Sequence, residues 1–294
     1  MSDLRNYLMK PIQMKNNLDL YPIKIMEYER FRDLAAKYLI LDIPQLNNKR
    51  RQEGISLLEF DNLFDYLKSF IDTDRTSCEI VKKIKEINKL TYKEKKDLIS
   101  SSEDIKNMIL NEKVYKNLNL QHFESEIIEM MTMAIKKKVV YNDKIQCFDI
   151  YDENDELIAC IDSYNFYEFR KIVMEQNLLF EPLIAPNKKA QKYIDASLRN
   201  DSGQESDIEA IVAFVSTNSF TGDISNYTYY RLMAEFRSLI KQMNRSDVVS
   251  YSAAGATKKN GSPLDIPNIV SKLEVNKNPY DDVFKEVNKN EKDK

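Results

Sequence analysis

Side chains that could carry out catalysis are scarce in this sequence. It has a single histidine, His122, and three widely spaced cysteines, Cys78, Cys147 and Cys160. A nucleophile pair would require Cys147 to approach His122 from another part of the chain. The cysteines form no CxxC motif, which argues against a disulfide framework and against a zinc site. We interpret them as free thiols and His122 as a residue at a helix start, and we expect no enzymatic activity.

Phosphate and metal sites also lack their usual motifs. The glycines, at positions 54, 203, 222, 255 and 261, are too scattered for a GxxxxGK[ST] or GxGxxG phosphate loop. A cluster of carboxylates could bind magnesium or calcium, but it lacks the glycine and the spacing of a calcium loop. We interpret it as the solvated tip of a hairpin, and we expect no metal and no cofactor. The carboxylates are Asp149, Asp152, Glu153, Asp155 and Glu156.

A basic stretch raises the alternative of nucleic-acid binding. Lys82 to Lys96 contains seven lysines and two glutamates, and such stretches can contact phosphates. Lysines without arginines give no readout of bases. Ile80, Ile84 and Ile87 have helical spacing, which indicates an amphipathic helix with a basic outer face. We do not expect nucleic-acid binding, although a nucleic-acid-associated replication or regulatory protein remains an alternative.

Helix signals run along most of the chain. A serine, threonine or asparagine followed three residues later by glutamate is typical of a helix start. The apolar stripe from Leu57 to Ile71, after the first such pair, predicts a helix, as do stripes over 25–38, 120–134, 166–173, 208–215 and 229–243. The sequence therefore predicts a mainly α fold. The pairs are Ser56/Glu59, Thr76/Glu79, Thr91/Glu94, Asn165/Glu168 and Ser206/Glu209.

One segment has a different period. Apolar and polar residues alternate over 145–151, turn formers follow, and the extended pattern resumes at 157–161, which predicts a β-hairpin that 139–141 could extend. We therefore divide the chain into a helical bundle-like part (1–140), a hairpin (141–162), a second helical part (163–245) and an extended C-terminal arm with a disordered tail (246–294).

Aromatic residues are the strongest sign of an interaction surface. Tyrosine has a large apolar body and a polar tip, which suits both cores and protein interfaces. The segment 227–236 carries more aromatic residues than one helix face needs, so core packing and partner contact both stay open. The partner-binding candidates are Tyr227, Tyr229, Tyr230 and Phe236 on this helix and Tyr251, Tyr280 and Phe284 on the arm.

The chain shows no signal for export or membrane insertion. Residues 1–10 contain no apolar h-region, and no run reaches the roughly 18 apolar residues of a transmembrane helix. Its net charge is −3, and unpaired cysteines suit a reducing compartment. We expect a cytoplasmic protein that neither spans nor binds a membrane.

Four short segments of the chain carry a family resemblance: LYPIKIMEYERF (20–31), FRKIVMEQNLLFEP (169–182), YTYYRLMAEFRSLI (227–240) and NPYDDVF (278–284). They resemble segments of tail-morphogenesis proteins of large tailed phages of Gram-positive hosts, a class that includes tail assembly chaperones and baseplate hub components. The resemblance implies a non-enzymatic structural or assembly protein of the tail or baseplate, oligomeric within its assembly. Its partners would be other tail or baseplate proteins, including the tape-measure protein, first in the host cytoplasm and then in the virion tail. A transient chaperone absent from the virion is the alternative.

Overall fold

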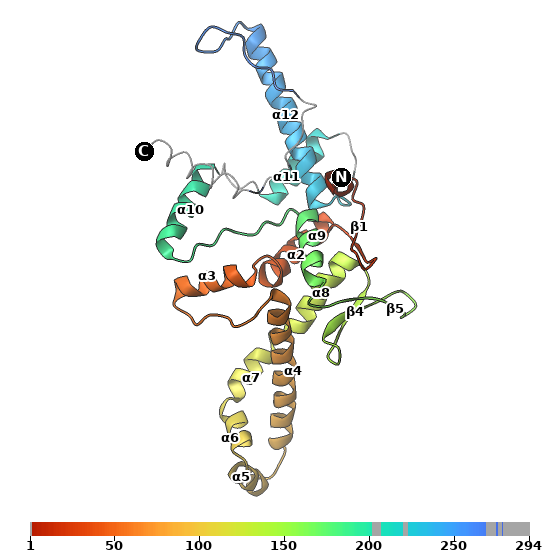
Figure 1. The fold of residues 1–294 in the computed structure, drawn as a ribbon, viewed down its shortest axis with the longest axis vertical. Helices are drawn as coiled ribbons and strands as arrows, with labels where there is room; N and C mark the ends of the chain where they lie inside the picture. The colour runs from red at the N-terminus through yellow and green to blue at the C-terminus, as the bar shows by residue number, and fades with distance from the viewer. Residues whose placement is uncertain (1, 202–206, 220–222, 269–274, 276–277, 279–294) are drawn as a thin grey trace. The chain divides into compact units, whose positions relative to one another are not determined.

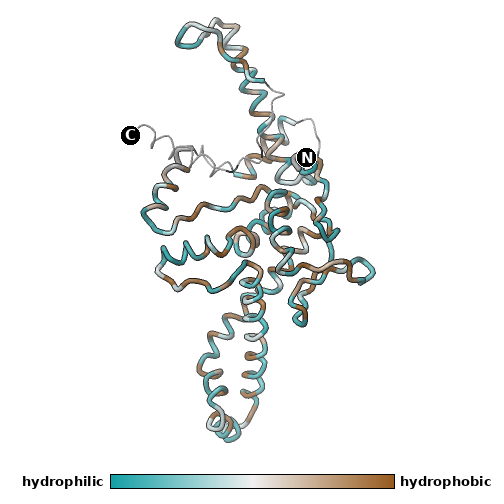
Figure 2. The backbone as a smooth tube through the Cα atoms, viewed as in Figure 1, coloured by the Kyte–Doolittle hydropathy of each residue, from teal (hydrophilic) through white to brown (hydrophobic). Residues whose placement is uncertain are grey.

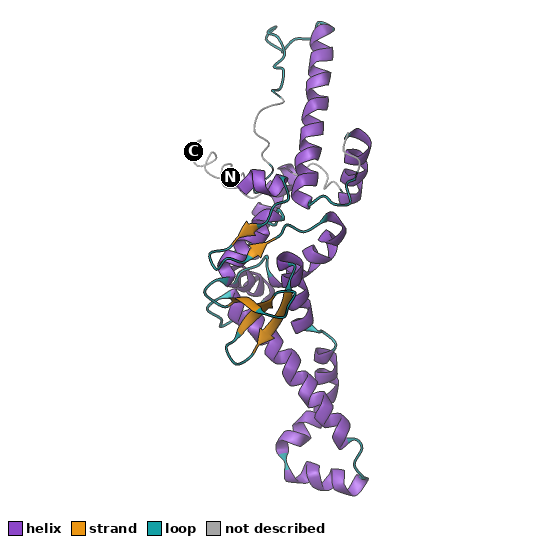
Figure 3. Cartoon of the chain, turned by 90° about the vertical axis from the view of Figure 1, so that its right-hand side faces the viewer, coloured by secondary structure: helices purple, strands orange, loops and turns teal. Residues whose placement is uncertain are grey.

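Helices dominate the computed structural model, which describes residues 2–201, 207–219, 223–268, 275 and 278 (Figures 1 and 3). The mainly α fold class is thereby confirmed. The chain divides into two compact units, each of which is described separately below. Unit 1 comprises Met1–Leu58, Met133–Lys136 and Tyr167–Lys294, and unit 2 comprises Glu59–Thr132 and Lys137–Phe166. Unit 1 thus combines segments from the ranges 1–140 and 163–245.

Unit 1 is built from helices whose apolar faces meet in a common core. Phe31 and Leu34 of α2 and Phe169 of α9 are fully buried there. The long helix α12 packs against α11 and α1. A two-stranded antiparallel ribbon, β1 with β2, pairs Ile12 with Leu20. The elements are α1 (Ser2–Tyr7), β1 (Ile12–Gln13), β2 (Asp19–Leu20), α2 (Ile25–Tyr38), α3 (Ile43–Glu53), α9 (Phe166–Gln176), α10 (Lys188–Asp201), α11 (Ile208–Asn218) and α12 (Tyr229–Ala253).

Buried polar side chains connect distant segments of unit 1. The guanidinium of Arg170 on α9 donates to the carbonyls of Leu39 (2.7 Å) and Ile40 (2.7 Å), just after the end of α2. It also donates to Glu181 Oε1 at 2.6 Å. The amide of Asn177 accepts from the Ile23 backbone N–H at 2.9 Å. These bonds satisfy backbone groups that helix ends and loops leave unpaired.

Unit 2 consists of a long helical projection and a small sheet. Helix α4 runs out, α5 lies at its far end, and α6 and α7 return along it (Figure 1). We call the segment Leu63–Asn119 the α4–α7 leg. The strands form an antiparallel sheet in the order β3-β4-β5, which confirms the predicted hairpin and its third strand. The elements are α4 (Leu63–Ile87), α5 (Tyr92–Ser101), α6 (Glu103–Leu110), α7 (Glu112–Asn119), α8 (Phe123–Ile135), β3 (Lys138–Asn142), β4 (Cys147–Tyr151) and β5 (Leu157–Ile161).

The core of unit 2 is aromatic. Phe148 of β4 is fully buried, and its ring lies 5.9 Å from the ring of Phe64 and 5.1 Å from that of Tyr141. At the edge of this core, Arg75 of α4 donates to Glu124 at 2.6 Å and to Asp143. Hydrophobic contacts and a charged bridge therefore both hold α4 against α8 and the sheet.

The predicted helix starts are correct in part. Thr91 and Glu94 form a reciprocal capping box at α5. The predicted start at Ser56 is wrong, because the side chain of Asn47 binds both the N–H and the carbonyl of Leu58 and holds that segment as a loop. Helix α4 begins only at Leu63, where the N-cap Asn62 accepts from the Asp65 N–H at 2.9 Å.

Three further pairs differ from the prediction in detail. Thr76 lies inside α4 and starts no helix. Helix α11 is capped by Asp207, one residue after the predicted Ser206, which lies outside the described residues. Before α9, Asn165 accepts from the Asp162 N–H, whereas Glu168 accepts from the Lys15 N–H. Short polar side chains therefore act near the predicted starts of α9 and α11, with different partners, whereas Thr76 caps no helix.

The C-terminal arm begins later than predicted and turns back. Helix α12 continues to Ala253, because no helix breaker precedes Gly255, which adopts a φ of +86°. The following chain folds back along α12, where Arg245 donates to the Pro267 carbonyl at 3.1 Å. Val275 is buried against Tyr230. In its described part, the arm is therefore anchored to the helix that precedes it.

Candidate functional site: interaction surfaces

The two residues considered for nucleophilic catalysis have different surroundings. His122 lies just before α8, with an exposed side chain and a φ of +53°. Cys147 is buried in β4, and its thiol donates to Asp149 Oδ1 at 3.2 Å. Burial, followed by the hydrogen bond to Asp149, raises the pKa of Cys147 to about 12. The thiol therefore stays protonated at neutral pH, which does not suit a nucleophile.

This raised pKa predicts slow alkylation of Cys147. The ordinary value is near 9.0, so the native protein at pH 8 should contain about a thousandfold less Cys147 thiolate than the unfolded chain. Iodoacetamide labelling followed by peptide mass spectrometry should show that difference when native and urea-unfolded protein are compared. Because the folded pKa is raised, the native state keeps a proton that the unfolded chain loses, and stability should fall as the pH rises from 9 to 12. Equal labelling rates in the two states would contradict the assignment.

The acidic cluster is only partly the solvated hairpin tip that the sequence predicts. Asp152 shapes the tip by accepting from the N–H groups of Asn154 and Glu156. Asp149 is instead buried and accepts from Asn142 Nδ2 at 2.7 Å. Its position on the central strand, flanked by β3 and β5, explains the burial. Among the described residues, no group of three or more histidine, cysteine, aspartate or glutamate side chains is placed to hold a metal ion.

The aromatic candidates at the start of α12 and just before it lie largely in the core of unit 1. Tyr227 is buried under the guanidinium of Arg231, which lies 4.2 Å from its ring centre. Tyr230 is buried as well. Tyr229 stacks on Tyr28 with ring centres 4.2 Å apart. The core-packing interpretation accounts for these three side chains.

The remaining candidates are placed differently. Phe236 is half-buried and meets Phe214 of α11 edge-on, with ring centres 5.5 Å apart. Tyr251, near the end of α12, is 62% exposed and is free to contact a partner. Tyr280 and Phe284 lie outside the described residues, so their assignment stays a prediction.

The α4–α7 leg and the residues just after it expose apolar side chains that the sequence analysis did not assign to a surface; Leu120 was placed in the helical stripe 120–134, but α8 begins only at Phe123. Leu110 is 72% exposed, Val114 is 54% exposed, and Leu120, just beyond the leg, is 70% exposed. None of the helices α5, α6 and α7 contains a buried residue. Hydrophobic and hydrophilic residues alternate along the leg (Figure 2). Helices α6 and α7, which contact α4, are therefore packed on one side only, and exposed apolar surface of this kind is typical of protein contacts.

The basic stretch lies on the same leg. Val81, Ile84 and Ile87 of α4 are buried, whereas Lys82 and Lys83 are exposed, which confirms the amphipathic helix with a basic outer face. Most of the lysines of this stretch are therefore exposed to solvent.

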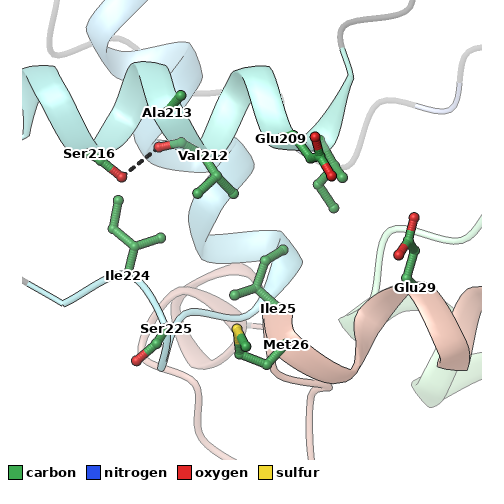
Figure 4. A pocket seen from close by; sticks show the side chains of 10 residues that line it. Ile25, Met26, Glu29, Glu209, Val212, Ala213, Ser216, Ile224 and Ser225 are labelled. Atoms are coloured by element: carbon green, nitrogen blue, oxygen red, sulfur yellow. Dashed lines mark hydrogen bonds between the residues drawn. The ribbon is translucent and has the colours of Figure 1, made fainter.

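A second surface feature is an apolar groove in unit 1. It has a volume of about 710 Å³ and lies between the start of α2 and one face of α11. Figure 4 shows the side chains of Ile25, Val212 and Ile224 turned into it, with Glu29 and Glu209 at one end. Neither helix reveals this groove from its sequence alone, because α2 and α11 are far apart in the chain. The residues that line it are Ile25, Met26, Glu29, Ile208, Glu209, Val212, Ala213, Ser216, Ile224 and Ser225.

Comparisons with protein-family models, with curated proteins and with solved structures found no match to this chain. Among the helices that the structure describes, none combines the length and the apolar character needed to cross a membrane.

Proposed function

We propose that this chain is a non-enzymatic structural or assembly protein of a phage tail or baseplate that acts through protein–protein contacts. The observation that carries the proposal is the α4–α7 leg, whose returning helices pack on one side only and expose Leu110 and Val114. A partner that covers these side chains removes apolar area from water, which favours association. The leg is therefore the main contact surface in this proposal.

The connection to phage tails rests on the resemblance of four segments, and the structure adds the role of two of them. The segment 20–31 contains the start of α2, and the segment 227–240 forms the first half of α12. In both, the aromatic residues Tyr28 and Tyr229 stack within unit 1. These segments therefore serve the fold of unit 1, and the leg of unit 2 serves the partner.

A transient chaperone is the second candidate, since one-sided amphipathic helices also suit reversible binding of a partner. The two roles differ in whether finished particles contain the chain. The nucleic-acid alternative rests on the exposed lysines of the leg, among them Lys82 and Lys83, and it requires binding that weakens steeply as the salt concentration rises.

A leg variant tests the protein-contact proposal. The triple substitution Leu110→Ser, Val114→Ser and Leu120→Ser should abolish recovery of tail or baseplate proteins when the tagged chain is purified from phage-producing cells. A few well-packed, desolvated side chains near the centre of an interface typically contribute most of its binding energy. Circular dichroism should show unchanged helix content, because these side chains are exposed.

A matched control uses exposed apolar residues of the sheet in the same unit. Val140→Ser with Leu157→Ser, at positions 40% and 58% exposed, should leave recovery unchanged. The proposal would be contradicted by wild-type chain that recovers no tail or baseplate protein, or by a leg variant that recovers them as well as the control does.

A further inference from the structure

The groove of unit 1 is a preformed apolar site whose lining is held in place by contacts within the unit. Ile25 and Ile224 are packed in a hydrophobic cluster with Val212, and the N–H of Ile25 donates to the Tyr227 carbonyl at 2.7 Å. These contacts fix the start of α2 against the segment that leads into α12. Met26, at the edge of the groove, remains 77% exposed. A large apolar side chain from outside could enter this groove without rearranging it.

The groove also has a charged end. The carboxylates of Glu29 and Glu209 lie at the same end of the groove (Figure 4), and both residues are exposed. Within the described part of the chain, neither carboxylate forms an ion pair. An occupant that complements this site therefore combines an apolar anchor with lysine or arginine beside it.

The chain itself carries a side chain of this kind. Tyr92, at the first position of α5, is 84% exposed. The capping box of Thr91 and Glu94 fixes the backbone on either side of it. Lys96 lies one helical turn further on the same face, and Lys93 adjoins Tyr92. A rigidly held tyrosine among lysines is a typical anchor for a protein interface.

We propose that the groove binds Tyr92 of a second copy of this chain, with Lys93 and Lys96 of that copy placed beside Glu29 and Glu209. The two surfaces are different, so the contact is heterologous and each copy can both donate a tyrosine and accept one. Repeated contacts of this kind build a ring or an open chain of copies. The proposal goes beyond the proposed function and does not depend on it, since it concerns only contacts between copies.

Sedimentation velocity on the full chain measures this association directly. The contact is small, so oligomers should form at concentrations on the order of 100 μM and should dissociate as the salt concentration rises. Tyr92→Ala should weaken association by about tenfold or more, because it removes the anchor. Tyr164→Ala is the matched control, since Tyr164 is a 93% exposed tyrosine of the same unit, and it should associate like wild type.

Charge reversal gives the sharpest test. The groove variant (Glu29→Lys with Glu209→Lys) and the anchor variant (Lys93→Glu with Lys96→Glu) should each be monomeric, because like charges then meet at every contact. A mixture of the two variants should associate again, because each contact between unlike variants is attractive. The proposal is overturned by a wild-type chain that stays monomeric throughout, by association that survives Tyr92→Ala or either charge reversal, or by a mixture that remains monomeric.

Discussion

The substitution Arg170→Met is expected to lower the free energy of unfolding of unit 1 by about 3 kcal/mol. The Arg170 side chain is buried and donates to the carbonyls of Leu39 and Ile40, which follow the end of α2, and to Glu181. Methionine fills a similar volume but offers no donor, so both carbonyls lose their partner. Chemical denaturation, followed by circular dichroism, measures the change.

Two further variants define what the Arg170 result means. Lys171→Met changes the neighbouring exposed residue of α9 and should alter stability by less than about 0.5 kcal/mol. Arg170→Lys keeps the charge, but an ammonium group lacks the planar guanidinium that reaches three acceptors at once. The free energy of unfolding of Arg170→Lys should therefore lie between those of wild type and Arg170→Met. Equal stability of wild type and Arg170→Met would show that the hydrogen bonds of Arg170 do not stabilise the contact between α9 and the end of α2.

The substitution Phe148→Ala is expected to destabilise unit 2 by about 3–5 kcal/mol. Phe148 is fully buried, and its ring meets those of Phe64 and Tyr141, so alanine leaves a cavity that no single neighbour can fill. Hydrogen exchange should show faster opening of β3, β4 and β5. A protection pattern identical to that of wild type would contradict the placement of Phe148 at the centre of this core.

The control for Phe148 lies on the other face of the same sheet. Val140 of β3 is 40% exposed, and Val140→Ala should change stability by about 0.5 kcal/mol or less. The loss of stability caused by Phe148→Leu should lie between the losses caused by Val140→Ala and by Phe148→Ala, because leucine refills part of the cavity.

Much of the fold follows from local patterns in the sequence. The helical spacing of Tyr28, Phe31, Ala35 and Tyr38 predicts α2, and all four residues are buried in the structure. The change of period after residue 144 predicts the hairpin of β4 and β5. Such signals suffice where one face of an element packs and the other is solvated.

The errors arise where distant residues decide local structure. Asn47 binds the backbone of Leu58, eleven residues along the chain, and thereby prevents the helix that the Ser56 pair predicts. The aromatic residues of α12 exceed the needs of one face because α12 packs against both α11 and α1, and Val275 covers Tyr230. Counting residues along one helix cannot show how many neighbours that helix has.

The candidate surfaces were harder to predict than the fold. Leu110 and Val114 have helical spacing, but the sequence does not show which stripe of α6 and α7 faces α4 and which faces solvent. The groove requires α2 and α11 to lie side by side, although Met26 and Val212 are far apart in the chain. Both features depend on tertiary packing, which single-element patterns do not encode.

Cross-linking mass spectrometry of phage particles purified from cells that produce this chain tests the proposed function most directly. We expect the chain to be recovered at a fixed ratio to other tail or baseplate proteins, with cross-links from Lys106, Lys113 and Lys116 of the α4–α7 leg to another polypeptide. Recovery only from assembly intermediates, with the same cross-links, would assign the transient chaperone role. Absence of the chain from particles and intermediates alike, or a leg that forms no cross-link to another protein, would contradict the account.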